Sequence, residues 1–229
     1  MADLRIKDLV VEYSNAGDAI RVIDGLDLEV TAGSLVILLG PSGCGKTTLL
    51  SCIGGILSPT DGHIQIGDID ITTLDRRRLT AYRRSTVGII FQSFNLVASL
   101  TALENVMVPL WAAGWSLRAA RERADELLTR VGLQDRMTHR PGELSGGQQQ
   151  RVAVARAIAL DPPLILADEP TAHLDHVQVE GVLRLLRELA SGERIVVVAT
   201  HDTRILPFAD RVVELVPDFP KAELIEGAR

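Results

Sequence analysis

The chain has 229 residues, of which 46% are hydrophobic and 24% charged, and its formal net charge is −6. These values are typical of one large globular domain and exclude a disordered chain, and the acidic balance argues against non-specific nucleic-acid binding. We expect no secretory signal and no membrane span, because no apolar run is long enough, and two cysteines are too few for a disulfide framework, which suits a reducing cytosol.

Short apolar runs typical of buried strands alternate with helical patterns along the chain. The runs lie at residues 35–39, 87–91, 164–167 and 195–199, after a first strand pattern that ends at Tyr13. A helix begins at Lys46 and ends near Gly54, and an apolar stripe between Val179 and Leu189 indicates another. This alternation predicts an α/β fold with a mainly parallel sheet and helices on its faces.

Residues 93–143 contain no convincing strand and are rich in Ala, Leu, Arg and Glu. We interpret them as a helical insertion, in which 119–130 is the clearest helix. Trp111 and Trp115 offer a docking patch for a partner helix, but we expect them to pack within the insertion. The arginines at 76–78, 83 and 84 are interpreted as a solvated helix face. The tail after Val216 carries two prolines and is expected to be frayed or loosely docked.

Residues 40–47 match the pattern G-x-x-x-x-G-K-[ST], which is typical of a loop that holds phosphates. The glycines let backbone N–H groups converge on the phosphates, Lys46 adds a positive charge, and the Thr47 hydroxyl is a ligand for Mg²⁺. The predicted binding residues are Gly40, Ser42, Gly43, Cys44, Gly45, Lys46, Thr47 and Thr48.

Polar residues follow the predicted strands at their carboxyl ends, where ligands bind in open α/β sheets. Asp168 comes directly after the run 164–167 and is predicted to hold Mg²⁺ with Thr47. Glu169 is predicted to act as general base toward an attacking water. The alternative is a pair of solvated acids before a turn. Gln92 is predicted to touch Mg²⁺ and water, and His201 to donate to a γ-phosphate.

A second anion site is predicted at Ser145, Gly146 and Gly147, which precede a helix that runs through Ile158. The free N–H groups at a helix N-terminus attract anions. This site makes sense if it completes the nucleotide site of another subunit, and the alternative is a cap that serves folding only. Tyr13 offers an aromatic face on which an adenine base can stack.

In this order the residues resemble the nucleotide-binding subunits of ATP-binding cassette (ABC) transporters, over nearly the whole chain from about Leu4 to Val216. The resemblance rests on Tyr13, the loop at 40–47, Gln92, the signature segment at 144–148, the acids Asp168 and Glu169, the loop at 172–175, and His201. It implies a single domain with a P-loop NTPase core at 1–92 and 150–216, including an N-terminal antiparallel β part, a helical subdomain at 93–149 and a tail at 217–229.

The resemblance also implies an ATPase that works as a head-to-tail homodimer around two ATP molecules with Mg²⁺. Each site would join Lys46, Thr47, Gln92, Asp168, Glu169 and His201 of one subunit with Ser145, Gly146, Gly147 and Gln148 of the other. Glu169, His201, Gln92 and Lys46 are the implied catalytic residues. The helical subdomain would pass the motion to a separate transmembrane permease, which would hold the chain at the cytoplasmic face of the membrane.

Within this family the strongest resemblance is to macrolide exporters, lipoprotein-release ATPases and the cell-division ATPase. It is carried by residues 91–96, 103–110 and 144–156 and by Asp202 after His201. It implies export or extraction of a lipophilic substrate, or mechanical signalling across the membrane. The alternatives are an importer subunit, for example for amino acids, or a regulatory module without transport. His173 stands where relatives usually have Ala or Asn, so we expect it to affect coupling between the two sites.

Overall fold

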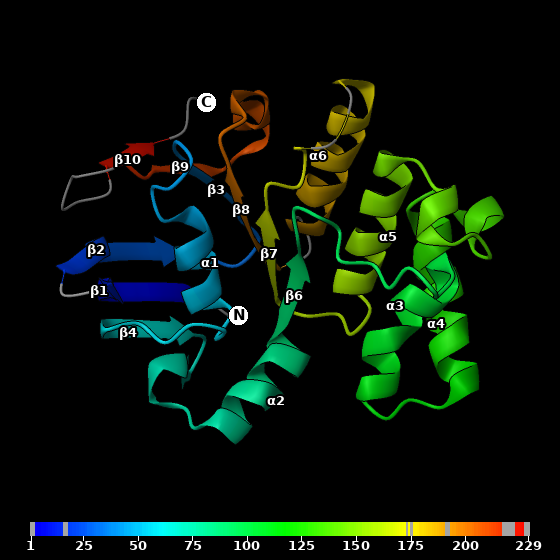
Figure 1. Cartoon of the computed structure of the whole chain (residues 1–229), viewed down its shortest axis with the longest axis horizontal. Helices are drawn as coiled ribbons and strands as arrows, with labels where there is room; N and C mark the ends of the chain where they lie inside the picture. The colour runs from blue at the N-terminus through cyan, green and yellow to red at the C-terminus, as the bar shows by residue number, and fades with distance from the viewer. Residues whose placement is uncertain are drawn as a thin grey trace.

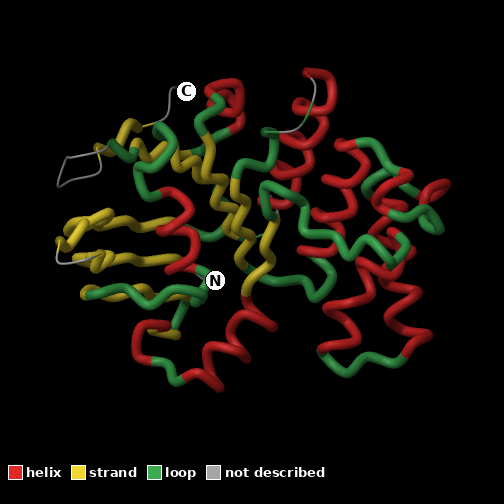
Figure 2. Tube along the Cα trace, viewed as in Figure 1, coloured by secondary structure: helices red, strands yellow, loops and turns green. Residues whose placement is uncertain are grey.

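The computed structural model describes residues 3–15, 18–172, 174, 176–190, 193–216 and 223–226. Two β-sheets lie beside each other, and a group of helices extends from one side of the second sheet (Figures 1 and 2). The first sheet is antiparallel, with the strand order β2-β1-β4-β5. Its strands are β1 (Leu4–Asn15), β2 (Asp18–Val30), β4 (Asp61–Ile66) and β5 (Ile69–Asp70).

The second sheet has the order β10-β9-β3-β8-β7-β6, and its pairs from β9 to β6 are parallel. Its strands are β3 (Leu35–Leu39), β6 (Val87–Ile90), β7 (Leu164–Asp168), β8 (Ile195–Thr200), β9 (Arg211–Glu214) and β10 (Glu223–Glu226). The central strands are covered on both faces, which explains their nearly continuous apolar sequences. The predicted α/β class, with a mainly parallel sheet and an antiparallel N-terminal part, is confirmed.

The helices cover the sheets and form the side extension (Figure 1). They are α1 (Lys46–Ile53), α2 (Arg76–Thr86), α3 (Ala102–Ala112), α4 (Leu117–Arg130), α5 (Gly146–Ala157) and α6 (His176–Ala190), with short 3-10 turns η1 (Ile71–Thr73), η2 (Gln134–Arg136), η3 (Pro141–Glu143) and η4 (Thr203–Phe208). Residues 93–143, all described, contain helices and turns but no strand, as predicted. None of the helices that the structure describes combines the length and hydrophobicity needed to cross a bilayer.

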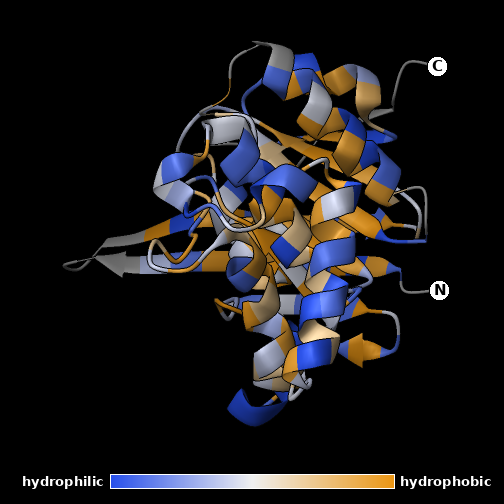
Figure 3. Ribbon diagram, turned by 90° about the vertical axis from the view of Figure 1, so that its right-hand side faces the viewer, coloured by the Kyte–Doolittle hydropathy of each residue, from blue (hydrophilic) through white to orange (hydrophobic). Residues whose placement is uncertain are grey.

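The alternation of side chains along β3 divides the core into two clusters. Val36 and Leu38 pack with the first sheet and α1, whereas Leu35 and Ile37 pack with the side chains of α3 to α6. Figure 3 shows the apolar segments gathered between the layers. Since both faces of the parallel sheet are buried, its polar residues are confined to the strand ends, which is where the candidate site lies.

Gly88 in β6 lets α5 pack directly against the sheet edge. A β-carbon at this position would lie 2.3 Å from the carbonyl oxygen of Ala157 and 3.0 Å from Pro162 Cγ. Real β-carbons do not approach backbone oxygens so closely, so the strand and the end of α5 pack in this way only because residue 88 is glycine.

The expectation for the tail is wrong for four of its residues. Residues 223–226 form β10, which pairs antiparallel with β9 in the register Glu223 to Glu214. The strand covers the edge that β9 would otherwise present, and Leu224 and Ile225 suit an extended backbone. The prolines that suggested fraying, Pro217 and Pro220, lie outside the described residues.

Candidate nucleotide-binding site

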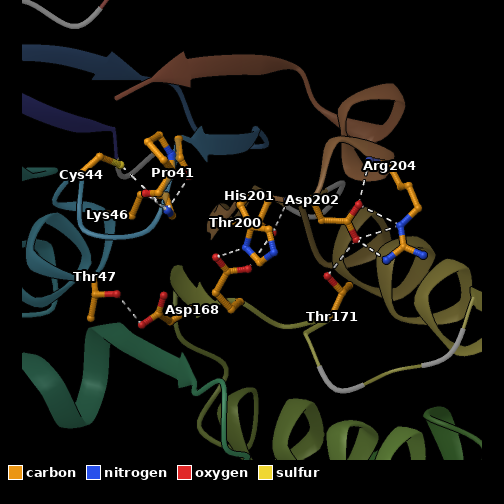
Figure 4. A network of polar contacts seen from close by, with 12 residues as sticks. Pro41, Cys44, Lys46, Thr47, Asp168, Thr171, Thr200, His201, Asp202 and Arg204 are labelled. Atoms are coloured by element: carbon orange, nitrogen blue, oxygen red, sulfur yellow. Dashed lines mark hydrogen bonds and ion pairs between the residues drawn. The ribbon is translucent and has the colours of Figure 1, made fainter. Parts of the chain in front are cut away.

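The phosphate loop lies between β3 and α1 and closes around its own lysine. Gly43 and Gly45 have φ angles of 86° and 96°, in the left-handed region that favours glycine. Lys46 is buried, and its Nζ donates to the carbonyl oxygens of Gly40 at 2.7 Å and Pro41 at 2.8 Å (Figure 4). The loop therefore holds the ammonium group that the motif predicts, in a backbone shape that its glycines allow.

Asp168 at the end of β7 faces the first turn of α1. Thr47 Oγ1 donates to Asp168 Oδ2 at 2.9 Å. The other oxygen, Oδ1, is buried and has no hydrogen-bond partner among the described residues. Burial raises the pKa of the Asp168 carboxyl above its ordinary value, and the nearby Glu169 adds to this, while Thr47 and Lys46 oppose it. A buried oxygen without a partner, beside a hydroxyl, fits a Mg²⁺ ligand set.

Glu169 is held at both carboxyl oxygens by the end of β8. Thr200 Oγ1 donates to Oε2 at 2.9 Å, and His201 Nδ1 lies 2.8 Å from Oε1 (Figure 4). Because an ionised carboxylate only accepts, Nδ1 carries the proton in this pair, which leaves Nε2 for another contact. Glu169 itself has φ 45°, a conformation that costs about 1–2 kcal/mol outside glycine. Such strain clusters at functional sites.

A cavity of about 330 Å³ opens beside this pair. Its lining residues include Glu169, Thr171, Ala172, His201 and Asp202. Arg204 forms a forked ion pair with Asp202, and this hydrogen bonding lowers the pKa of the Asp202 carboxyl. Thr171 Oγ1 also lies 3.4 Å from the carboxyl. The ion pair therefore fixes one wall of the space in front of Glu169.

Gln92 follows the end of β6 at the same edge of the sheet where Glu169 follows the end of β7. The two strand ends lie side by side because Ile90 pairs with Ala167 in parallel register. The chain after Gln92 turns through Phe94 and Asn95, with φ of 58° and 48°. Arg156 of α5 holds this turn, donating to the carbonyl oxygens of Phe94 at 2.7 Å and Asn95 at 2.5 Å.

Tyr13 lies beside α1, 43% exposed, with its hydroxyl 3.3 Å from Thr48 Oγ1. This contact connects the end of the first strand pattern to the phosphate-loop helix. The aromatic ring thus stands next to the predicted phosphate site, and its role in stacking on adenine remains a prediction.

The signature segment caps α5. Ser145 Oγ accepts from the Gln148 backbone and the Gln148 side chain accepts from the Ser145 backbone, which is a complete capping box. Gly147 faces Gln178, whose amide oxygen would lie 2.2 Å from an added β-carbon. Figure 1 shows α1 and α5 on opposite sides of β7, so one chain does not bring the phosphate loop and the signature segment together.

The structure therefore brings together the phosphate loop, Asp168, Glu169 and His201, and it keeps Ser145 to Gln148 apart. His173 lies outside the described residues. Thr200 and Arg156 had no role predicted from the sequence. Thr200 could have been found as the one hydroxyl at the end of an otherwise apolar strand. Nothing in the local sequence indicates the contact that Arg156 makes with Phe94 and Asn95.

The family model of the ABC transporter matches residues 23–172. An uncharacterized ABC transporter ATP-binding protein of Mycobacterium tuberculosis is 73% identical over 219 residues, or 96% of this chain and 66% of the relative. The lipoprotein-releasing system ATP-binding protein LolD 1 of Rhodospirillum rubrum is 42% identical and covers 93% of this chain and 95% of its own length. The macrolide export ATP-binding/permease protein MacB of Hyphomonas neptunium is 43% identical over 93% of this chain, which spans 33% of that protein.

A solved structure agrees over the whole fold. The ATP-binding cassette MJ0796, described as a dimer in a post-hydrolysis state bound to ADP and Pi, superposes with a TM-score of 0.90, 38% identity and 99% coverage of both chains. Together with the site geometry, these matches show that the chain belongs to the ABC transporter family and is an ATP-binding, ATP-hydrolysing domain of it.

Proposed function

We propose that this chain hydrolyses ATP as a head-to-tail dimer and so drives a separate membrane permease. The observation that carries the proposal is the separation of the two predicted anion sites in one chain. The phosphate loop gathers with Asp168 and Glu169, while the capped end of α5 lies across β7 from α1. A second copy in head-to-tail orientation supplies the missing half of each site, as the dimeric state of the related cassette MJ0796 supports.

Each residue of the site has a proposed task. Lys46 and the loop from Gly40 to Thr48 bind the phosphates, and Tyr13 stacks on the base. Glu169, oriented by Thr200, takes the proton of the attacking water, and His201, protonated on both ring nitrogens, donates from Nε2 to the γ-phosphate. Thr47, Asp168 and Gln92 would hold Mg²⁺, which neutralises phosphate charge when bound. Ser145, Gly146, Gly147 and Gln148 bind the nucleotide of the other subunit.

We further propose that residues 93–149 move as a helical unit and that the permease binds where this unit meets the core. A groove of about 540 Å³ lies there, between α2, β6 and the second half of α3. Its walls include Arg83, Arg84, Phe91, Val108 and Arg156. The groove adjoins the segment after Gln92, because Arg156 contacts both, so a change at Gln92 reaches the groove through one side chain.

Export or extraction of a lipophilic substrate, or mechanical signalling through the permease, is the output that the relatives favour. The matched proteins include a lipoprotein-releasing system ATPase and a macrolide export protein, each above 40% identity over 93% of this chain. In this arrangement the chain lies at the cytoplasmic face of the membrane, held there by the permease.

The proposed reaction is tested with Glu169→Gln, which keeps the shape of the side chain and removes its basicity. We expect ATP hydrolysis to stop while ATP binding persists, so that the variant accumulates as an ATP-bound dimer in size-exclusion chromatography with light scattering. The control is Glu193→Gln, a carboxylate in the turn before β8 and away from the phosphate loop. Wild-type turnover by Glu169→Gln would refute the assignment of the base.

The proposed partner is tested by purifying the tagged chain from gently solubilised membranes and identifying the co-purifying membrane protein by mass spectrometry. A permease with few spans and a large extracytoplasmic domain supports export, extraction or signalling. A permease with many spans and a solute-binding protein would instead identify an importer.

A further inference from the structure

Helix α2 concentrates positive charge on a chain whose net charge is negative. Five of its eleven residues are arginines, whereas the whole chain carries a formal charge of −6. Arg76, Arg77, Arg78 and Arg84 are exposed, and Arg83 is half-buried, where it donates to the carbonyl oxygen of Gly55. Figure 3 shows the hydrophilic helix at the lower end of the molecule.

The exposed arginines of α2 form no ion pair with an acid among the described residues. Within the part of the chain that the structure describes, none of Arg76, Arg77, Arg78 and Arg84 forms an ion pair. The same is true of the exposed Arg130 and Arg136, whereas Arg118 and Arg184 are paired within their own helices. Five like charges on one short helix repel one another, although no two of these arginines are at the i,i+3 or i,i+4 spacing that places side chains next to each other. An anionic partner would remove this repulsion.

The end of α3, the turn that follows it and the start of α4 expose large apolar side chains. Trp111 and Trp115, the two tryptophans of the chain, are 39% and 42% exposed, and Leu117 is 68% exposed. The expectation that the tryptophans pack within the helical insertion is therefore met only in part. Tryptophan prefers the interface of a bilayer, because its ring is apolar and its N–H can hydrogen-bond.

The basic helix and the aromatic turn lie on the same side of the molecule. The groove described above has Thr80, Arg83 and Arg84 of α2 on one wall and Val108 and Ala112 of α3 on the other. Trp111 is the neighbour of Ala112 in α3, and Figure 1 shows α2 and the α3–α4 turn both at the lower edge. This lower face (α2 with Trp111, Trp115 and Leu117) therefore surrounds the groove with unpaired arginines and exposed tryptophans.

We propose that this lower face rests on a lipid surface rich in anionic headgroups. The arginines of α2 contact the phosphates of the headgroups, and Trp111, Trp115 and Leu117 enter the interface between headgroups and acyl chains. The chain thus binds the membrane directly, in addition to any permease in the groove. The unpaired positive charge selects an anionic surface, and the overall negative charge of the chain orients the remaining faces away from it.

The experiment uses the purified full chain without nucleotide or permease. It measures co-sedimentation with vesicles of phosphatidylcholine alone or mixed with phosphatidylglycerol, and it records tryptophan emission at the same time. We expect binding to the anionic vesicles only, weakened by added salt, with a shift of the emission to shorter wavelength. Since both tryptophans lie on the lower face, the emission reports which face touches the lipid.

The test variant replaces Arg76, Arg77 and Arg78 with glutamine. We expect its affinity for anionic vesicles to fall on the order of 100-fold, since each arginine near an anionic surface contributes about fivefold. The matched control replaces Arg130, Arg136 and Arg184, three exposed arginines on α4, η2 and α6, and so changes the net charge equally. Thermal melting confirms that both variants are folded. The control is expected to bind like the wild type.

Three outcomes would overturn the proposal. They are absence of wild-type binding at low salt, equal loss in the two triple variants, or binding that leaves the tryptophan emission unchanged. Loss of permease co-purification by the α2 variant, with vesicle binding intact, would assign the arginines to a protein partner instead. ATP hydrolysis is assayed separately, so failure of the proposed reaction and failure of lipid binding are distinguished.

Discussion

Thr47 Oγ1 donates to Asp168 Oδ2 at 2.9 Å and so joins the start of α1 to the end of β7, across 121 positions of the sequence. The contact exists because β3 and β7 both flank β8, so that the loop after β3 and the acid at the end of β7 meet at one edge of the sheet. It orients one oxygen of Asp168 and leaves the other, buried and without a partner among the described residues, for a cation.

Removing the hydroxyl of Thr47 should therefore weaken the binding of Mg²⁺·ATP. We expect Thr47→Val to raise the dissociation constant by roughly 10- to 100-fold, the usual effect of removing a group that orients or ligates a metal. Thr47→Ser keeps the hydroxyl and should restore the affinity. Isothermal titration with Mg²⁺, and again with a chelator, checks the prediction, because an equal loss under both conditions would show that Thr47 acts on the nucleotide and not on the metal.

Asp168→Asn should stabilise the nucleotide-free chain at neutral pH. Burial raises the pKa of Asp168, so the folded state disfavours the charged form, and the carboxylate costs stability above that pKa. As the pH falls below the ordinary aspartate range, the carboxyl is neutral in both states and the advantage of the variant should vanish. Thermal melts across this pH range measure it. With Mg²⁺·ATP present, the wild type should melt at a higher temperature than Asp168→Asn. If Mg²⁺·ATP stabilised the variant as much as the wild type, the assignment of Asp168 as a metal ligand would be contradicted.

Thr200→Val should slow hydrolysis without changing the affinity for ATP. The hydroxyl of Thr200 orients Glu169 Oε2, and losing one such hydrogen bond costs about 1–1.5 kcal/mol, or roughly tenfold in rate. Thr200 acts here as a positioning residue, so Thr200→Ser should recover most of the rate. Steady-state turnover and ATP affinity are measured in parallel, and a matching loss of affinity would mean that the substitution disturbs the whole site.

Gly88→Ala should destabilise the fold far from the nucleotide. The new β-carbon would lie 2.3 Å from the carbonyl oxygen of Ala157. Both the strand β6 and the end of α5 are backbone at this contact, so no flexible side chain can move to relieve it. We expect the free energy of unfolding to fall by about 1–3 kcal/mol or more. Gly142→Ala is the matched control, because a β-carbon there meets no atom within 4 Å. Urea denaturation distinguishes the two, and equal stability of both variants would show that α5 can shift away from β6.

The sequence predicted those parts of the fold and site that depend on local pattern. The apolar runs gave four strands of the parallel sheet to within about one residue, and the phosphate-loop motif located Lys46 and Thr47. A motif of this kind works because its glycines and its lysine are needed together in one short loop. The same holds for the helix cap at Ser145, because Ser145 and its capping partner Gln148 are only three residues apart in the sequence.

Contacts between distant segments were not predictable in the same way. The strands β3, β7 and β8 have similar apolar sequences, so nothing in them specifies that Asp168 pairs with Ala199 and that Thr200 therefore reaches Glu169. The strand β10 was missed because nearby prolines suggested a frayed or loosely docked tail, whereas pairing depends on the free edge of β9. The exposure of Trp111 and Trp115 depends on how α3 and α4 pack, which apolar content alone does not determine.

Arg156 has a consequence for how information travels in the proposed dimer. It lies near the end of α5, roughly 16 Å along the helix from the cap at Ser145, and it lines the groove and grips the turn after Gln92. A displacement that starts at the cap of α5 or at the turn after Gln92 therefore passes through the guanidinium of Arg156. Each subunit would thus compare the nucleotide in its own loop with the one held by its partner, and its output at the groove would require agreement between the two.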